Sequence, residues 1–365
     1  LTGWPIYHCL IVANLLVAAP AIINYLQHNG LTKCPTTTCV FGVLLFIVLS
    51  QLSRLDTWMA REGFVSFVKI VAYFLLLVAT VNSRTRLFGF LGLIVAFTLV
   101  LVSLAVLQYH GLIELDAISA IVDAGDIDEI TGDAIQVRRL RATGIFSDPN
   151  DLSMIIVACL LISTCGLLYP GMGLTRALLL APIGLLLYAL SLTHSRGGLL
   201  ALFAGFGVLV YSRYGIWKSA MLAAVAAPVA LVIFGGRQTG FSDAISGGTG
   251  RARAELWSAG LQAFRESPVF GIGYGMYEEY AGQVAHNSFV HAFTELGFFG
   301  GMMFLGVFAG IGLSLYRLNL AKAEVLDPAI RHFVPFMLAI VWIGVLMVAL
   351  AALMPIYSLA GSIGR

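Results

Sequence analysis

Long apolar runs constrain this chain more than any other feature of its sequence. Ten stretches rich in Leu, Ile, Val, Phe and Ala follow one another, and most are long enough to cross a bilayer as a helix. The runs cover residues 4–26, 39–53, 64–82, 87–108, 152–169, 177–193, 197–212, 216–235, 288–316 and 333–358. Hydrophobic residues make up 59% of the chain and charged residues only 11%, which excludes a soluble domain. The sequence therefore predicts an all-α, polytopic integral membrane protein in which residues 1–365 form a single helical domain.

The charges between the runs predict the orientation of the helices. Acidic residues gather in two long connections, 109–151 and 236–287, whereas the short connections are mainly basic. Because short loops rich in Lys and Arg stay in the cytoplasm, we expect the two long loops to be periplasmic and to contain short amphipathic helices. The basic cytoplasmic positions are then Lys33, Arg84, Arg86, Arg176, Arg213, Lys218, Arg317, Lys322 and Arg331. Both ends of the sequence would emerge in the periplasm, so we expect one more helix at each end, about 12 in a full chain.

The segment HNSFVHAFTELGFFG, which begins at His286, marks the end of the second long loop and the start of an apolar helix. Asn287 and Ser288 are residue types that cap helix N-termini. His286 is therefore expected at the water boundary, partly desolvated and near the positive end of the helix dipole, which favours a neutral imidazole that can accept a proton. A general base must be unprotonated and able to accept a proton, so His286 is a candidate for this role. The alternative is a polar residue that only begins a helix.

Arginines lie near the end of the first long loop and just before the apolar run 197–212. Arg139 and Arg141 precede the turn Asp-Pro-Asn-Asp that leads into the run 152–169. Arg196, in THSRGGLL, lies at the outer boundary of a helix beside two glycines, which would let a ligand or another backbone approach closely. A charged arginine there must be solvated or paired. The alternative for Arg196 is snorkelling to the membrane interface.

The second long loop contains the stretch RARAELWSAGLQAF, whose apolar residues recur at roughly helical spacing. This pattern predicts an amphipathic helix along the membrane surface. Its apolar positions are Leu256, Ala259, Leu261 and Phe264. Its basic positions are Arg251, Arg253 and Arg265.

Three glycines at alternate positions, Gly271, Gly273 and Gly275, follow this helix. A nucleotide-binding loop is rejected because no strand precedes the glycines and no suitable helix follows them. The segment is instead interpreted as a tight turn. Its tyrosines, Tyr274, Tyr277 and Tyr280, are expected to anchor it at the membrane interface.

No metal site, organic cofactor or nucleic-acid surface is predicted. The five cysteines mostly lie in or beside apolar runs, and none of their spacings matches a zinc site. Asp126 and Asp128 form an Asp-x-Asp pair, with which many glycosyltransferases hold a divalent metal, but the pair lies in an acidic stretch typical of a solvated surface. The net charge of +2 is not concentrated in a patch suited to nucleic acid.

Four motifs in a fixed order, RATGIFSDPNDLS, SRGGLLAL, ESPVFGIGYG and HNSFVHAFTELGFFG, resemble the bacterial O-antigen ligase and polymerase superfamily. His286-Asn287, nine residues, Gly297, two residues and Gly300 is similar to the signature of its ligases. The resemblance covers about residues 56–301. It implies a metal-independent glycosyltransferase of the bacterial inner membrane with its active site facing the periplasm.

The resemblance also implies substrates and residue roles. The glycan would be carried on undecaprenyl diphosphate among the membrane lipids, and the acceptor would be lipid A core or a second glycan. His286 matches the catalytic histidine, and Arg196, with Arg265 of the large outer loop, matches the essential arginines that would stabilise the leaving diphosphate without a metal. Inversion at the anomeric carbon would follow. The residues expected to support substrate binding are Arg139, Arg141, Arg251, Arg253, Asn287 and Glu295.

Two features keep the details open. Glu295 lies about four residues after His291 on one helix face and is expected to pair with that histidine or with an arginine.

For the function, ligation of O-antigen to lipid A core is preferred, and an O-antigen or exopolysaccharide polymerase is the alternative. A polysaccharide transporter or flippase comes third, because few charged side chains lie at mid-membrane, where ion-coupled carriers keep them.

Overall fold

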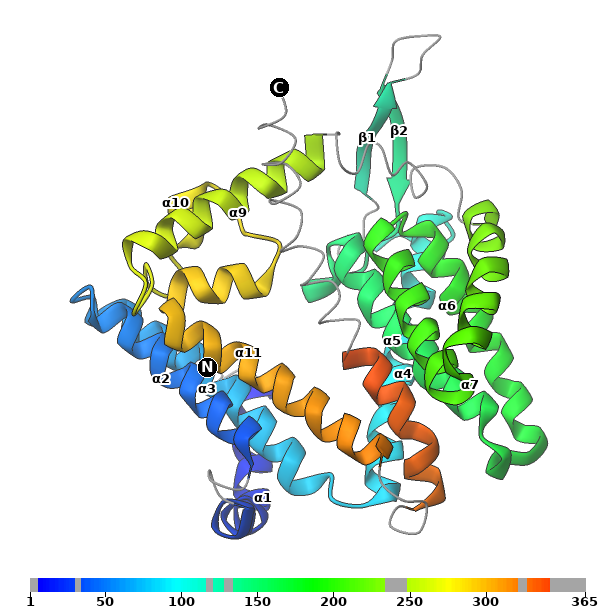
Figure 1. The fold of residues 1–365 in the computed structure, drawn as a ribbon, viewed down its shortest axis with the longest axis horizontal. Helices are drawn as coiled ribbons and strands as arrows, with labels where there is room; N and C mark the ends of the chain where they lie inside the picture. The colour runs from blue at the N-terminus through cyan, green and yellow to red at the C-terminus, as the bar shows by residue number, and fades with distance from the viewer. Residues whose placement is uncertain are drawn as a thin grey trace. The chain divides into compact units, whose positions relative to one another are not determined.

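The computed structural model describes residues 6–29, 34–115, 121–127, 134–233, 248–320 and 327–341 (Figure 1). In these ranges seven helices are long and apolar enough to cross a membrane. They are α1 (Ile6–Asn29), α2 (Pro35–Leu52), α3 (Thr57–Thr80), α4 (Arg84–Tyr109), α5 (Pro149–Leu168), α6 (Leu180–Leu192) with the 3-10 helix η2 (Pro170–Leu179) before it, and α11 (Ser288–Leu320). Two shorter apolar helices are Arg196–Tyr211 and Pro328–Val341. An all-α, polytopic membrane protein is therefore confirmed.

The seventh and eighth runs, 197–212 and 216–235, were expected to be separate helices. Both lie in the range of α7 (Arg196–Ile233), and a break in its backbone falls between them, as expected. This helix is broken at Gly215, whose φ of 76° and ψ of 178° leave the helical region in a way that glycine permits. The tenth run is described only as far as Val341, and the prediction of ten helices stays a prediction.

Sequence signals set the helix starts. The carboxylate of Asp56 accepts a hydrogen bond from the Met59 amide at 2.8 Å, which satisfies one of the free N–H groups at the start of α3. Asp148 does the same for Asn150 at 2.6 Å at the start of α5, where Pro149 occupies the first turn. The Asp-Pro-Asn-Asp turn is thus a helix cap, as its composition indicated.

The first long loop contains a strand pair where short helices were expected. β1 (Ile121–Ile127) pairs antiparallel with β2 (Ala134–Arg139), and Ile121 lies opposite Arg139. β-branched residues in both segments favour extended backbone over helix, which explains the difference. The described part of the second long loop contains helices as predicted, α9 (Gly248–Glu266) and α10 (Tyr277–Ala281).

The chain divides into two compact units built from interleaved segments. The first takes its described residues from Leu1–Leu87 and Ser246–Ser314, and the second from Phe88–Ile245 and Leu315–Met347. In the first unit α2 packs against α11, because small residues let the two helices approach. A Cβ atom added to Gly306 would lie 2.7 Å from the sulfur of Cys39.

In the second unit α5 is the most buried of the candidate spans, with half of its apolar window inside the protein. Leu152, Ile156 and Leu160 are almost fully buried along it. Both α6 and α7 pack against this helix. The start of α5 therefore lies in a well-supported position, which matters for the arginines described below.

Candidate functional site

Helix α11 is broken at Gly297, the first glycine of the Gly-x-x-Gly signature. Gly297 has a φ of 70°, and a Cβ atom there would lie 2.2 Å from the carbonyl oxygen of Val269. The chain at Gly271 is equally close, because a Cβ atom there would lie 2.3 Å from the carbonyl of Glu295. Two backbones therefore cross in contact, and both positions require glycine.

The crossing exposes carbonyl groups of α11 to the glycine-rich segment. Ile272 N donates to Thr294 O at 2.9 Å, and Gly273 N donates to Glu295 O at 3.1 Å. The segment with alternate glycines thus hydrogen-bonds to the broken helix through its own amides. We call residues 271–275 the clamp segment, because their amides hold the broken helix α11 through backbone hydrogen bonds.

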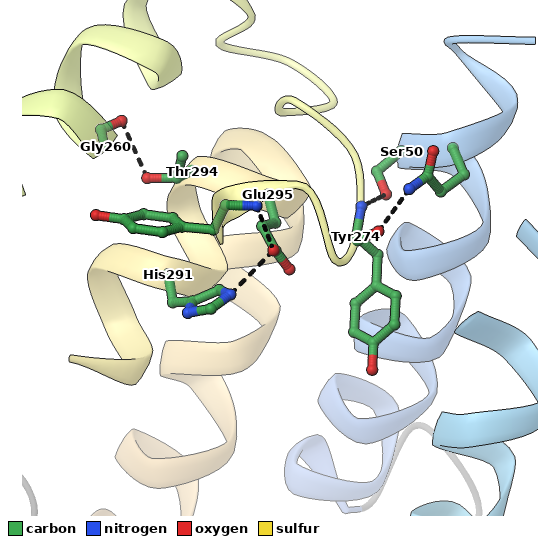
Figure 2. A network of polar contacts seen from close by, with 8 residues as sticks. Ser50, Gly260, Tyr274, His291, Thr294 and Glu295 are labelled. Atoms are coloured by element: carbon green, nitrogen blue, oxygen red, sulfur yellow. Dashed lines mark hydrogen bonds and ion pairs between the residues drawn. The ribbon is translucent and has the colours of Figure 1, made fainter. Parts of the chain in front are cut away.

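The clamp is also fixed to the end of α2 (Figure 2). Tyr274 N donates to the Ser50 hydroxyl at 3.2 Å, and the Gln51 side-chain amide donates to the Tyr274 carbonyl. Residues more than 220 positions apart are thereby joined in the first unit. The turn between α2 and α3 and the second long loop must therefore lie on the same side of the membrane.

A buried carboxylate lies beneath the clamp. Glu295 is only 4% exposed, its Oε1 accepts a hydrogen bond from Tyr277 N at 3.0 Å, and the same oxygen lies 2.9 Å from His291 Nε2 (Figure 2). The Tyr277 ring stacks on His291 with centroids 4.7 Å apart. Of the two expected partners of Glu295, the structure selects His291. Glu295 supports the loop and α11, and it contacts none of the predicted arginines through these bonds.

The same contacts correct the interpretation of Tyr277. It was expected to be an interface anchor, but it is 1% exposed and its hydroxyl donates to the Leu256 carbonyl at 2.7 Å. Burial, followed by the charge of Glu295, raises the pKa of Tyr277 to about 12. The phenol is therefore protonated and acts as a structural donor. Tyr280 is exposed, as an interface residue would be.

Helix α9 exists as predicted, but its buried face is shifted. Trp257, Gly260 and Ala263 are its buried residues, whereas Leu261 is 46% exposed. Gly260 leaves room for its carbonyl to accept a hydrogen bond from Thr294 Oγ1 at 3.0 Å (Figure 2). Small residues decide which face packs, because they let α11 and α10 come close to the helix backbone.

His286 directly precedes Asn287, the residue that caps α11, and its backbone is held from both sides. The preceding carbonyl, that of Ala285, accepts a buried hydrogen bond from Trp257 Nε1 at 2.6 Å. The following residue, Asn287, caps α11 through its Oδ1, which accepts from Phe289 N at 3.0 Å. The backbone at His286 is thus fixed while its side chain is exposed. The protein itself does not bury the imidazole, and its desolvation at the membrane boundary stays a prediction.

Among the described residues, three non-glycine residues have positive φ: Leu55 at 61°, His194 at 47° and His286 at 48°. Each comes directly before a residue whose side chain accepts a hydrogen bond from the first turn of the next helix. These residues are Asp56, Ser195 and Asn287. A side chain in this region of backbone space is uncommon and is kept there by its neighbours. For His286 the neighbours are Trp257 and the Asn287 cap.

The arginines of α9 belong to the same unit as His286. Arg265 is exposed in the last turn of α9, and the described residues give it no hydrogen bond or ion pair. Arg251 and Arg253 lie in the first part of α9, but their side chains are outside what the structure describes. Their predicted roles stay predictions.

The remaining predicted arginines lie in the second unit, where the start of α5 meets the start of α7. Arg139 Nε donates to the Thr193 carbonyl at 2.9 Å, and its terminal nitrogen donates to Asn150 Oδ1 at 3.2 Å. The same Asn150 oxygen accepts from the Ser195 hydroxyl at 2.9 Å. Arg139 thus joins the end of β2 to both helix starts.

Arg196 is the first residue of α7 and is half-buried. Ser195 Oγ accepts from Gly198 N at 3.1 Å, which caps the helix. A Cβ atom on Gly198 would lie 2.5 Å from Ser153 Oγ, so this glycine admits α5 and not a ligand. Arg141 is also half-buried, two residues after Arg139. The unit therefore gathers three of the predicted arginines near two adjoining helix N-termini, which favour anions.

The predicted site residues lie in two groups, and their roles stay predictions. The first unit holds His286, Asn287, Glu295 and Arg265, and the second holds Arg139, Arg141 and Arg196. Sequence reasoning missed Trp257 and Asn150, which hold the backbone of these groups. A tryptophan within an amphipathic loop helix was a signal for the first, and a capping turn directly after an arginine cluster was a signal for the second.

The expected absence of a metal site stays a prediction. Within the described ranges no group of three or more His, Cys, Asp or Glu side chains is arranged to hold a metal ion. The side chain of Asp126 and the whole of Asp128 lie outside the described residues.

Comparison with known families gives one match. The family model for O-antigen ligase (Wzy_C) matches residues 181–305, a range that includes Arg196, the clamp segment and the start of α11 with His286. A comparison with curated proteins finds no match to the chain. The family match supports the resemblance seen in the motifs: residues 181–305 of this multi-pass membrane protein, about a third of the chain, are similar to the O-antigen ligase family.

Proposed function

We propose that the protein transfers a glycan from undecaprenyl diphosphate to an acceptor hydroxyl at the periplasmic face of the bacterial inner membrane, and that it ligates O-antigen onto lipid A core. The observation that carries the proposal is the position of His286. Its backbone is fixed by the Trp257 bond to Ala285 and by the Asn287 cap, while its imidazole is exposed to a substrate. A base held in this way is pre-organised for proton transfer.

In this reaction the acceptor oxygen forms a bond to the anomeric carbon while the bond from that carbon to the diphosphate oxygen breaks. The electron pair leaves with the diphosphate, and the acceptor proton passes to the imidazole of His286. Attack from the face opposite to the leaving group inverts the anomeric centre. The diphosphate ester supplies the free energy, so no nucleotide is consumed.

Arginines are suited to the leaving diphosphate because their planar forks stay protonated and match phosphate oxygens. We assign this role first to Arg196, at the N-terminus of α7, and to the exposed Arg265. Arg141, Arg251 and Arg253 are the supporting candidates. Arg139 donates to Thr193 O and to Asn150, so we assign it to holding the α5 and α7 starts in place.

The test uses purified protein in lipid nanodiscs with an undecaprenyl-diphosphate glycan and either lipid A core or a second lipid-linked glycan as acceptor. Glycan on lipid A core is the expected product. A longer lipid-linked glycan would show a polymerase of the same superfamily instead.

The variant that isolates the base is His286→Asn, because asparagine tolerates positive φ and preserves the backbone. Turnover should fall by on the order of 100- to 10,000-fold, since that is the usual contribution of a general base, with little change in affinity for the lipid-linked glycan. His28→Ala, on α1, is the control and should be unaffected. Wild-type turnover by His286→Asn would refute the assignment.

A further inference from the structure

A cleft of about 490 Å³ lies in the first unit beside the clamp segment. Its walls come from the α2–α3 turn, the last turn of α9 and α10. Arg54, Glu266, Glu279 and Tyr280 provide its polar and aromatic groups, and Ile272 and Met276 provide its apolar groups. The volume is within the usual range for small-molecule sites.

Charged groups in this cleft have unused hydrogen-bonding capacity. Among the described residues, neither the guanidinium of Arg54 nor the carboxylate of Glu279 has a hydrogen bond or an ion pair. Glu266 Oε1 accepts only long bonds, from the Tyr280 hydroxyl at 3.3 Å and from Gln262 at 3.5 Å. Opposite charges that share a cleft without pairing leave both donors and acceptors for a guest.

The balance of charge selects the chemistry of that guest. Two carboxylates disfavour a phosphate, and the single arginine disfavours a cation. A sugar hydroxyl can donate to a carboxylate and accept from a guanidinium at the same time. The half-exposed ring of Tyr280 and the side chain of Met276 offer apolar contact to the C–H faces of a sugar ring.

We propose that this cleft is a subsite for uncharged sugar residues of the transferred glycan, a proposal that rests on the proposed function. Its wall at Ile272 is hydrogen-bonded to Thr294, seven residues after Asn287 on α11. At a rise of 1.5 Å per residue this wall lies roughly 10 Å along the helix from the start that follows His286. The subsite therefore takes sugar residues away from the reacting carbon.

A subsite at that distance contributes to binding in the ground state and the transition state alike. Its loss should raise KM and leave kcat nearly unchanged. The test variants are Arg54→Ala and Glu279→Gln, both at exposed positions. Their matched controls are Arg61→Ala on α3 and Glu278→Gln on α10, which change the same charges outside the cleft.

Binding is measured by calorimetry with the full-length protein in nanodiscs and two probes. One probe is the phosphate-free glycan released from the lipid-linked substrate by mild acid, and the other is inorganic pyrophosphate. Arg54→Ala and Glu279→Gln should each weaken binding of the released glycan about 10- to 100-fold, because each removes a hydrogen bond to a charged group. Affinity for pyrophosphate should not change, and both controls should match wild type.

The possible results separate the two proposals. Wild-type glycan affinity in both cleft variants would overturn the subsite even if transfer proceeds normally. Weaker pyrophosphate binding in Arg54→Ala would also overturn it, since the cleft would then hold phosphate. Glycan binding that depends on Arg54 in a protein without any transfer activity would keep the subsite and refute the proposed function. Thermal unfolding of each variant verifies folding, and the near-isosteric Glu279→Gln decides the matter should Arg54→Ala fail to fold.

Discussion

Trp257→Phe is expected to release the backbone at His286 while it keeps an aromatic ring in the core. Trp257 is 3% exposed and packs with Tyr277 and Ala285. Its Nε1 is the partner of the Ala285 carbonyl at 2.6 Å, and phenylalanine has no donor to replace it. The substitution therefore removes one hydrogen bond and leaves the charge of the protein unchanged.

The size of the effect follows from burial. Ala285 is fully buried, so its carbonyl loses its partner without gaining water. Leaving such a group unsatisfied costs about 1–3 kcal/mol. The segment can recover hydration only by opening, so the equilibrium constant for local opening should rise by about 5- to 150-fold.

Hydrogen exchange measures that opening constant directly. The amides of Phe289 and Val290, which bond to the Asn287 cap, should exchange about 5- to 150-fold faster in Trp257→Phe. Turnover should fall in the same variant once the open form is populated, with glycan affinity unchanged. Trp58→Phe is the matched control, because Trp58 is 64% exposed on α3. Unchanged exchange in Trp257→Phe would refute the view that this tryptophan holds the backbone at His286.

Three further predictions concern other parts of the chain. Arg196→Lys should lose most transfer activity in a properly inserted protein, because a lysine cannot replace a planar fork on diphosphate; near-normal activity, measured with the lipid-linked substrate, would favour snorkelling. Chelation with EDTA should leave transfer intact, and loss of activity both with EDTA and in an Asp126→Ala, Asp128→Ala double variant would make that pair a metal site. Gly297→Ala should lower the thermal unfolding midpoint strongly or prevent insertion, because its Cβ would overlap the Val269 carbonyl; a stable variant, by thermal unfolding in nanodiscs, would show that the crossing can open.

The candidate site could be predicted only in part from the motifs. His286, Asn287 and Arg196 were each placed at a helix start by capping residues and by the change from polar to apolar sequence, and the structure agrees. These signals are local, because a cap acts within one turn of its helix. The burial of Tyr277 and the exposure of His286 were not predicted, because both depend on which distant segment packs against them.

The glycine-rich segment shows the same division. Its sequence excluded a nucleotide loop and indicated a tight turn. It could not indicate that Gly271 meets Gly297, or that Ser50 and Gln51 hold Tyr274. Hydrogen bonds between residues more than 220 positions apart leave no periodic pattern in either segment, so only the folded chain reveals them.

Hydropathy and capping are properties of short segments, so they predicted the membrane class and the residues at which several helices begin. The strand pair of the first long loop, the buried face of α9 and the pairing of Glu295 with His291 became visible in the folded chain. These features depend on close approach between segments, which small residues such as Gly260 permit. Such an approach is a property of two surfaces together, and neither segment encodes it alone.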